Sequence, residues 1–259
     1  MEYAIFISKV DELSLVGHNF SRLYFGNEFC QELIPSLEAL ERILDNTSDL
    51  KLTLVTPYVT NKGLAKLGPL LGMLSRERKD AEVVFNDWGV FRTLREEYST
   101  LQPVMGRLLN KMKRCPRISK ISHVIPEEDI HYFKNSNLTL KLFRDFLISN
   151  GVRRVEFDNL IQGFDLNSNG IDLSLYIPFV YVTTTRYCLA NACDIPHKKG
   201  VVGIFPCKKE CQRYTFFLKH KVMPVTLLRK GNTLFFKNET IPENIGTFSR
   251  IVIEPKVPM

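Results

Sequence analysis

Short apolar runs alternate with longer amphipathic runs over the first 185 residues of this 259-residue chain. Helical spacing of apolar residues predicts helices over 32–44, 62–75, 88–98 and 138–149. The alternation predicts parallel strands joined by crossover helices, as in a TIM-like barrel or an open doubly wound sheet. The predicted strands cover residues 3–8, 22–25, 50–56, 82–85, 118–124 (a weaker candidate), 152–157 and 175–183, with later β-like runs at 222–228, 233–237 and 250–254.

We therefore expect an α/β, TIM-barrel-like fold in a single domain spanning residues 1–259. A cysteine-rich segment, residues 186–213, is expected near the carboxyl ends of the strands. Because one chain of this length must supply both the barrel and these loops, we expect some of the eight helices to be short or absent.

Polar residues follow several predicted strands, in turns at 26–30, 56–58, 86–89 and 184–188. In a parallel barrel, such turns meet at the carboxyl-terminal mouth, where functional sites collect. Asp87 is better explained as a helix cap, and Arg186 is explained equally well by an anion or by a carboxylate partner. No catalytic residue can be assigned. The candidates for a pocket at this mouth are Glu28, Tyr58, Asn86, Asp87 and Arg186.

Four cysteines fall within 24 residues in the pattern C-x4-C-x13-C-x3-C. Thiolates bind soft metals, and four of them satisfy either a tetrahedral zinc ion or the four irons of a cubane cluster. A set of small buried apolar residues is the less favoured interpretation, because the surrounding Lys-rich segment is too polar to bury much. These four are Cys188, Cys193, Cys207 and Cys211; Cys30 lies far upstream after a strand, and Cys115 is expected to have no metal role.

The amino-terminal residues lack the pattern of a secretory signal, and no apolar run is long enough for a membrane span. These features predict a cytoplasmic protein, in which disulfides are rare.

The net charge is +7, and basic residues cluster around the cysteines and again between residues 107 and 120. They could meet an acidic redox protein, RNA or a small anion, but a solvated basic face is favoured because the net charge is modest. No aromatic-interleaved RNA-binding motif is present, so nucleic acid is a minor alternative. The cluster near the cysteines consists of Lys198, Lys199, Lys208, Lys209, Arg213, Lys219 and Lys221.

Four segments, in order, resemble motifs of the barrel proteins classed as collagenase-like peptidases, the peptidase U family. The segments are Leu23–Cys30, Val84–Gly89, Ile177–Cys188 and Cys207–Cys211. The resemblance covers roughly residues 1–240 and is greatest to the small, single-barrel, UbiV-like branch.

This resemblance implies a TIM-barrel-like protein with a [4Fe-4S] cluster held by Cys30, Cys188, Cys207 and Cys211. The UbiV-like branch acts with a partner protein in oxygen-independent ubiquinone hydroxylation. By resemblance the chain is expected to serve redox or hydroxylation chemistry under anaerobic conditions, as a subunit with a partner or electron donor. Cys193 departs from the family pattern and competes with Cys30 as the fourth ligand.

Two further functions stay open: a zinc-stabilised binding module without catalysis, and a peptidase or RNA-modification factor, as in other branches of the family. The peptidase interpretation is disfavoured, because neither H-E-x-x-H nor G-x-S-x-G occurs.

Overall fold

The structure, a computed structural model, describes residues 1–166, 170–195 and 205–259. Within the predicted cysteine-rich segment, residues 196–204 lie outside the described residues, and Lys198 and Lys199 are among them. In the described part of the chain, no helix is both long enough and apolar enough to cross a membrane.

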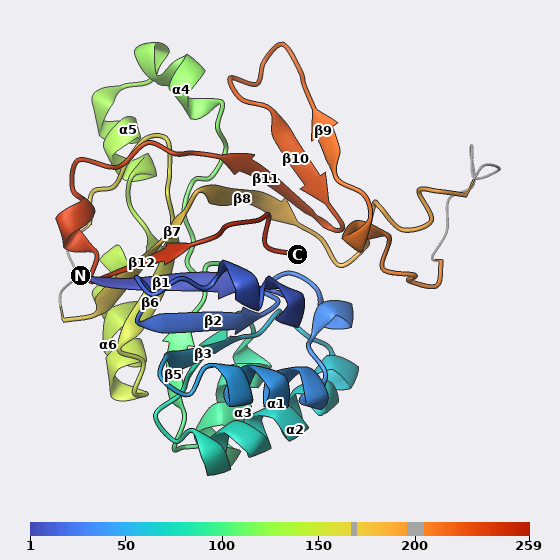
Figure 1. Cartoon of the computed structure of the whole chain (residues 1–259). Helices are drawn as coiled ribbons and strands as arrows, with labels where there is room; N and C mark the ends of the chain where they lie inside the picture. The colour runs from blue at the N-terminus through green and yellow to red at the C-terminus, as the bar shows by residue number, and fades with distance from the viewer. Residues whose placement is uncertain (167–169, 196–204) are drawn as a thin grey trace.

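Eight parallel strands form a closed barrel in the order β1-β12-β7-β6-β5-β4-β3-β2 (Figure 1). This confirms the predicted TIM-barrel-like fold. The strands are β1 (Glu2–Ile7), β2 (Arg22–Gly26), β3 (Lys51–Val55), β4 (Glu82–Phe85), β5 (Gln102–Met105), β6 (Arg154–Asp158), β7 (Asp172–Ile177) and β12 (Arg250–Ile253).

Helices cover only part of the barrel wall. Figure 1 shows α1–α3 packed together on one side of the strands, and α6 beside β6. Among the described residues, α6 is the last α-helix, so the later connections lack the crossover helices of a full barrel. The helices are α1 (Leu37–Asn46), α2 (Asn61–Glu77), α3 (Trp88–Glu97), α4 (Ile118–Ile121), α5 (Glu127–Phe133) and α6 (Lys141–Ser149).

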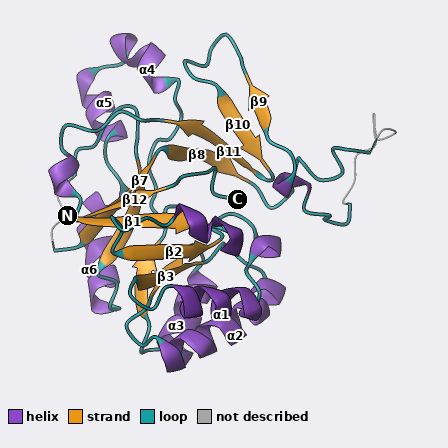
Figure 2. Ribbon diagram, viewed as in Figure 1, coloured by secondary structure: helices purple, strands orange, loops and turns teal. Residues whose placement is uncertain are grey.

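Between β7 and β12 the chain builds a second, antiparallel sheet, which we call the small sheet. Its order is β8-β11-β10-β9, and it lies beside the barrel on the side away from α1–α3 (Figure 2). An apolar layer that includes Phe29, Tyr181 and Phe235 joins the barrel mouth to this sheet. The strands are β8 (Phe179–Thr184), β9 (Phe216–Leu218), β10 (Leu227–Lys230) and β11 (Thr233–Lys237).

Three details of the sequence prediction are corrected. The run 118–124, predicted as a strand, forms α4 and a 3-10 turn over Ser122–Val124. The strand of the barrel that this run was expected to form is instead β5. Its four residues include Pro103 and show no clear strand pattern in the sequence. The run 175–183 is two strands divided at Pro178, and only the first belongs to the barrel.

The barrel interior holds apolar side chains at mid-height and ion pairs toward the amino-terminal end. There, Arg250 donates to Glu2 and Glu82 at 2.6 Å each. The Arg22 side chain donates to Glu2 at 3.0 Å. Residues at this end of a parallel barrel serve stability, whereas the opposite end is open to function. The apolar layer consists of Ala4, Phe6, Tyr24, Val55, Val84, Val104, Tyr176 and Val252.

Candidate functional site

Four cysteines line one cavity of about 850 Å³ between the barrel mouth and the small sheet, which we call the cysteine cavity. Cys30 comes from the turn after β2, Cys188 from the turn after β8, and Cys207 and Cys211 from the loop that leads to β9. Cys193 is exposed and does not line the cavity. Cys115 lies elsewhere and accepts a hydrogen bond from Arg117 Nε at 3.1 Å.

The turn that carries Cys30 follows from two neighbouring residues. Gly26 has φ +136°, and a Cβ there would lie 2.2 Å from the Val55 carbonyl oxygen, so only glycine lets β2 end so close to β3. Asn27 Oδ1 then accepts hydrogen bonds from the backbone N–H groups of Phe29 at 3.1 Å and Cys30 at 2.9 Å. This Asx-type turn fixes the position of Cys30.

A buried carboxylate ties the two other cysteine-bearing segments together. Glu210, which is 2% exposed, accepts from the Ala192 N–H at 2.8 Å and from the Lys208 N–H at 3.2 Å. Ala192 follows Cys188, and Lys208 follows Cys207. Glu210 therefore holds the two loops side by side. From the sequence alone, a glutamate in this Lys-rich segment would be expected to lie exposed to solvent.

Burial raises the pKa of the Cys30 thiol to about 11, and the neighbouring sulfurs of Cys211, Cys207 and Cys188 add to this effect. Burial likewise raises the pKa of Cys188 and of Cys211. A reactive cysteine needs a lowered thiol pKa, so this arrangement does not suit a cysteine nucleophile.

The described cysteine, histidine and acidic side chains include no group of three or more close enough to hold a single metal ion. The four cavity cysteines line a space of about 850 Å³. A zinc ion needs its sulfurs about 2.3 Å away, all around one centre. A cubane binds each cysteine through a different iron, so its ligands stand further apart.

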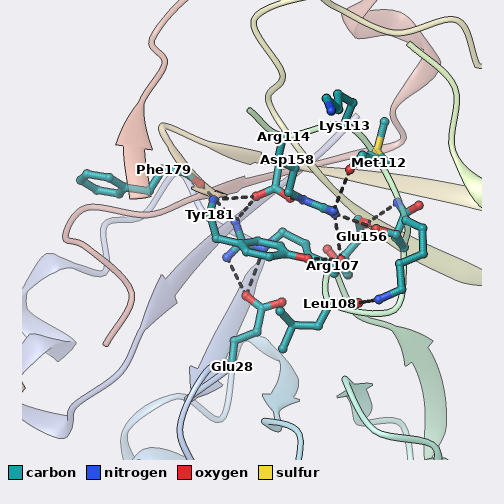
Figure 3. A network of polar contacts seen from close by, with 12 residues as sticks. Glu28, Arg107, Leu108, Met112, Lys113, Arg114, Glu156, Asp158, Phe179 and Tyr181 are labelled. Carbon is teal, nitrogen blue, oxygen red and sulfur yellow. Dashed lines mark hydrogen bonds and ion pairs between the residues drawn. The ribbon is translucent and has the colours of Figure 1, made fainter. Parts of the chain in front are cut away.

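A fully buried ion cluster, the Arg107 cluster, lies in the barrel mouth beneath the cavity. Arg107 donates to Glu28 at 2.6 Å and to Asp158 at 3.0 Å (Figure 3). It also donates to Glu254 at 2.8 Å. Arg114 donates to the second oxygen of Asp158 at 2.6 Å. Burial raises the pKa of Glu254 to about 8, despite the Arg107 charge that lowers it. Three carboxyl groups thus face two guanidiniums.

The structure brings the predicted pocket residues partly together. Asn86 Nδ2 donates to Glu28 Oε1 at 3.4 Å, and Tyr58, Asn86 and Arg186 line the same groove at the barrel mouth. Glu28 is fully buried in the Arg107 cluster. Asn86 is buried; its Nδ2 donates to Thr56 O at 2.9 Å and its Oδ1 accepts from Leu108 N at 3.0 Å, so it links three mouth turns. Asp87 is the N-cap of α3 and accepts from the Gly89 N–H at 2.7 Å.

Tyr58 and Arg186 are the two predicted pocket residues that line the cysteine cavity. Tyr58 donates its hydroxyl hydrogen to Thr185 O at 2.7 Å and accepts from Asn232 Nδ2 at 3.0 Å. The Arg186 guanidinium lies 5.7 Å from the Tyr58 ring centre.

Sequence reasoning missed Arg107, Asp158, Glu254, Asn232 and Glu210. Asp158 ends β6 and Glu254 follows β12 directly, so a carboxylate at a strand end was the available signal. Arg107 follows β5, which was not recognised as a strand.

No protein-family model matches the chain, and no curated protein matches it. Among solved structures, it is similar to the U32 peptidase Mk0906, with 12% identity, 99% of this chain and 93% of that chain covered, and a TM-score of 0.48. It is also similar to a glycoside hydrolase family 18 N-acetylglucosaminidase from Paenibacillus barengoltzii, with 8% identity and a TM-score of 0.38. This match covers 97% of this chain and 94% of the enzyme chain. An immunomodulatory chitinase from Trichuris suis is also similar, with 9% identity and a TM-score of 0.36. The match covers 97% of this chain and 91% of the chitinase chain. None of these similarities is close enough to indicate an activity.

Proposed function

We propose that the cysteine cavity binds a [4Fe-4S] cluster through Cys30, Cys188, Cys207 and Cys211. One observation carries the proposal: of six cysteines, four from three separate turns and loops line the same cavity. Chance burial of small side chains does not explain this, because Cys207 is exposed and its loop is polar. The set matches the one that the family resemblance implies.

A cluster fits this cavity better than a single zinc ion does. The described side chains do not converge as a four-coordinate zinc site requires. About 850 Å³ leaves room for a cluster with one iron per cysteine. Cys193 is exposed and lies off the cavity, which favours Cys30 as the fourth ligand.

The bound cluster would supply one-electron transfer. The chain's own residues then have distinct tasks. Phe29 and Met259 line the cavity and exclude water, while Asn27 and Glu210 hold the cysteine-bearing loops. Half-buried Lys230 interacts electrostatically with Cys211, and its charge offsets part of the negative charge of four thiolates.

We further propose that the chain is a UbiV-like member of the peptidase U family. In this role it works with a partner protein in oxygen-independent redox or hydroxylation chemistry. The four motif segments, in order, support this assignment. The raised thiol pKa values argue against the alternative of a cysteine peptidase.

Purification without oxygen tests the cluster. We expect a brown protein with broad visible absorption and about four irons per chain. Alanine variants of Cys30, Cys188, Cys207 and Cys211 should each lose iron, while Cys115→Ala, the matched control, should keep it. A colourless protein with one zinc would establish the zinc-stabilised module instead. Loss of iron in Cys193→Ala together with retention in Cys30→Ala would overturn the ligand set.

The redox role needs a separate experiment. Cells that lack this chain and grow without oxygen should lose hydroxylated quinone, whereas the same cells grown in oxygen should not. The wild-type chain should restore the quinone and Cys207→Ala should not. Restoration by Cys207→Ala would separate the function from the cluster.

A further inference from the structure

The outer edge of the small sheet is β9, and all three of its residues expose large apolar side chains. Phe217 is 69% exposed, and Phe216 and Leu218 are each 37% exposed. β9 pairs with β10, where Phe217 lies opposite Leu228. Within the described part of the chain, no strand pairs with the other side of β9, which lies at the end of the sheet away from β8 (Figure 1).

An edge strand of this kind is open to a further strand. Its outer main-chain N–H and C=O groups have no strand partner, and they form a template for pairing with another polypeptide. Natural edge strands often carry charged residues that prevent such pairing, but β9 carries none. A single exposed apolar residue is ordinary, whereas three in a row on an unpaired edge indicate a surface that a partner covers.

The sequence around β9 is basic throughout. Residues 211–238, which contain β9, β10 and β11, include no acidic residue, and neither do residues 98–126, which contain α4. The structure brings these two acid-free segments together, because Lys120 Nζ donates to the Lys221 carbonyl oxygen at 2.9 Å. Two stretches of positive charge that are far apart in the sequence therefore meet beside the end of β9.

The lysines at this junction have no acidic partner among the described residues. Lys120, Lys219 and Lys221 are all exposed, and none of them forms an ion pair there. The acidic residues Glu127–Asp129 belong to α5, which lies beyond α4 from β9 (Figure 1). The end of β9 therefore combines exposed apolar side chains with uncompensated cations.

These features together select the occupant. A second copy of this chain would place Lys219 and Lys221 against cations of the same kind, which is unfavourable. A lipid membrane would attract the lysines but leave the main-chain groups of the edge without hydrogen bonds. A strand that is apolar at its centre and acidic at its ends would satisfy the main-chain groups, cover the phenylalanines and pair with the lysines.

We propose that β9 is the docking edge for an apolar strand with acidic ends, supplied by a partner protein, which extends the small sheet. Because β9 has three residues, burial of side chains supplies much of the affinity. This deepens the proposed function and rests on it for the role of the partner. Cys211 precedes Phe216 by five residues, so the docked strand would lie within about 18 Å of a proposed cluster ligand, measured along the chain.

Fluorescence anisotropy of the anaerobically purified protein tests the edge with three labelled peptides. The acidic probe alternates valine and threonine between pairs of glutamates. One control peptide has lysines in place of the glutamates, and the other has proline in place of the central valine, which removes a main-chain donor.

We expect the acidic probe to bind at least about tenfold more tightly than either control and to weaken with added salt. Affinity equal to that of either control, or no binding up to about 1 mM, would refute the proposal.

Variants locate the binding. Phe217→Asp places an acid at the centre of the edge and should weaken binding of the acidic probe at least about tenfold. Lys219→Gln and Lys221→Gln should each weaken it about threefold. Leu142→Asp is the matched control and should change nothing, because Leu142 is 85% exposed on α6, away from β9 (Figure 1).

Two results would overturn the assignment. One is an unchanged affinity for the acidic probe in Phe217→Asp. The other is binding to phosphatidylglycerol vesicles that Phe217→Asp abolishes, without binding of the probe, because this would assign the edge to a membrane surface.

Iron is measured on the same samples. Selective binding of the acidic probe by a protein without iron would refute the cluster and leave the docking edge intact. Full iron content without selective binding would refute the docking edge alone.

Discussion

Glu156 makes the free energy of unfolding depend on pH in a direction opposite to that of an ordinary paired carboxylate. The side chain is fully buried inside the barrel, and burial raises its pKa from 4.5 to about 7. Tyr24 donates a hydrogen bond of 3.0 Å to one carboxylate oxygen. The other oxygen, Oε2, has no hydrogen-bond partner within the described residues. Arg250 and Arg154 lower the pKa but do not overcome the burial, and Glu82 raises it further.

The sign and size follow from proton linkage. Below about pH 4 the carboxyl group is protonated in both states, and the favourable contribution is fully present. As the pH rises, the unfolded chain loses this proton first and the native chain keeps it until about pH 7. Stability therefore falls over this range. A rise in pKa from 4.5 to about 7 corresponds to about 3 kcal/mol of lost stability.

Glu156→Gln removes this dependence, because glutamine resembles the protonated acid and still accepts from Tyr24. Relative to wild type, the variant should gain about 2 to 3 kcal/mol between pH 5 and pH 8. Urea denaturation followed by the fluorescence of Trp88, the single tryptophan, measures the difference. Glu41→Gln, on an exposed position of α1, is the control and should show no such gain. A difference between variant and wild type that stays constant from pH 5 to pH 8 would refute the reasoning.

Three further outcomes are expected. Glu210→Ala should lower the iron content of the purified protein although Glu210 is not a ligand, because the loops of Cys188 and Cys207 lose their common acceptor; iron equal to wild type would contradict this. Asp87→Ala should cost about 1 kcal/mol in urea denaturation through loss of the α3 cap, with Asp87→Asn restoring most of it; a neutral alanine variant would show that the cap is dispensable. Arg107→Met should cost about 3 to 5 kcal/mol at pH 8, because Glu28, Asp158 and Glu254 lose their shared cation. The cost should be less at pH 5, because burial raises the pKa of Glu254 to about 8 and this carboxyl group is then protonated; a cost independent of pH would argue for lost packing instead.

The alternation of strand and helix patterns was enough to predict parallel strands with crossover helices, because each early strand pairs with a neighbour close in sequence. It left a barrel and an open doubly wound sheet as alternatives, because closure depends on β12, at the far end of the chain. It was not enough to predict the small sheet. Residues 175–183 form one apolar run, and nothing local shows that Pro178 divides strands of two different sheets. The turn after β8 therefore reaches the cysteine cavity from the small sheet, not from a barrel strand as the sequence suggested.

The candidate site was predictable where residue type alone carries information. Cysteine is rare enough for its clustering to be a signal, so the candidate ligands could be named. The Arg107 cluster gave no such signal, because Arg107 and Glu254 are 147 residues apart and only barrel closure brings them together.

The position of β12 in the barrel has a consequence for the order of events during synthesis. Arg250 pairs with Glu2 across strands whose residues are made 248 positions apart, which at ribosomal rates corresponds to about 12 to 50 seconds. Until β12 emerges, β1 and β7 present unpaired edges. Every cysteine of the cavity has been translated by then. The nascent chain therefore displays all four thiols of the cysteine cavity before its last strand closes the barrel, so these thiols are available while the barrel is still open.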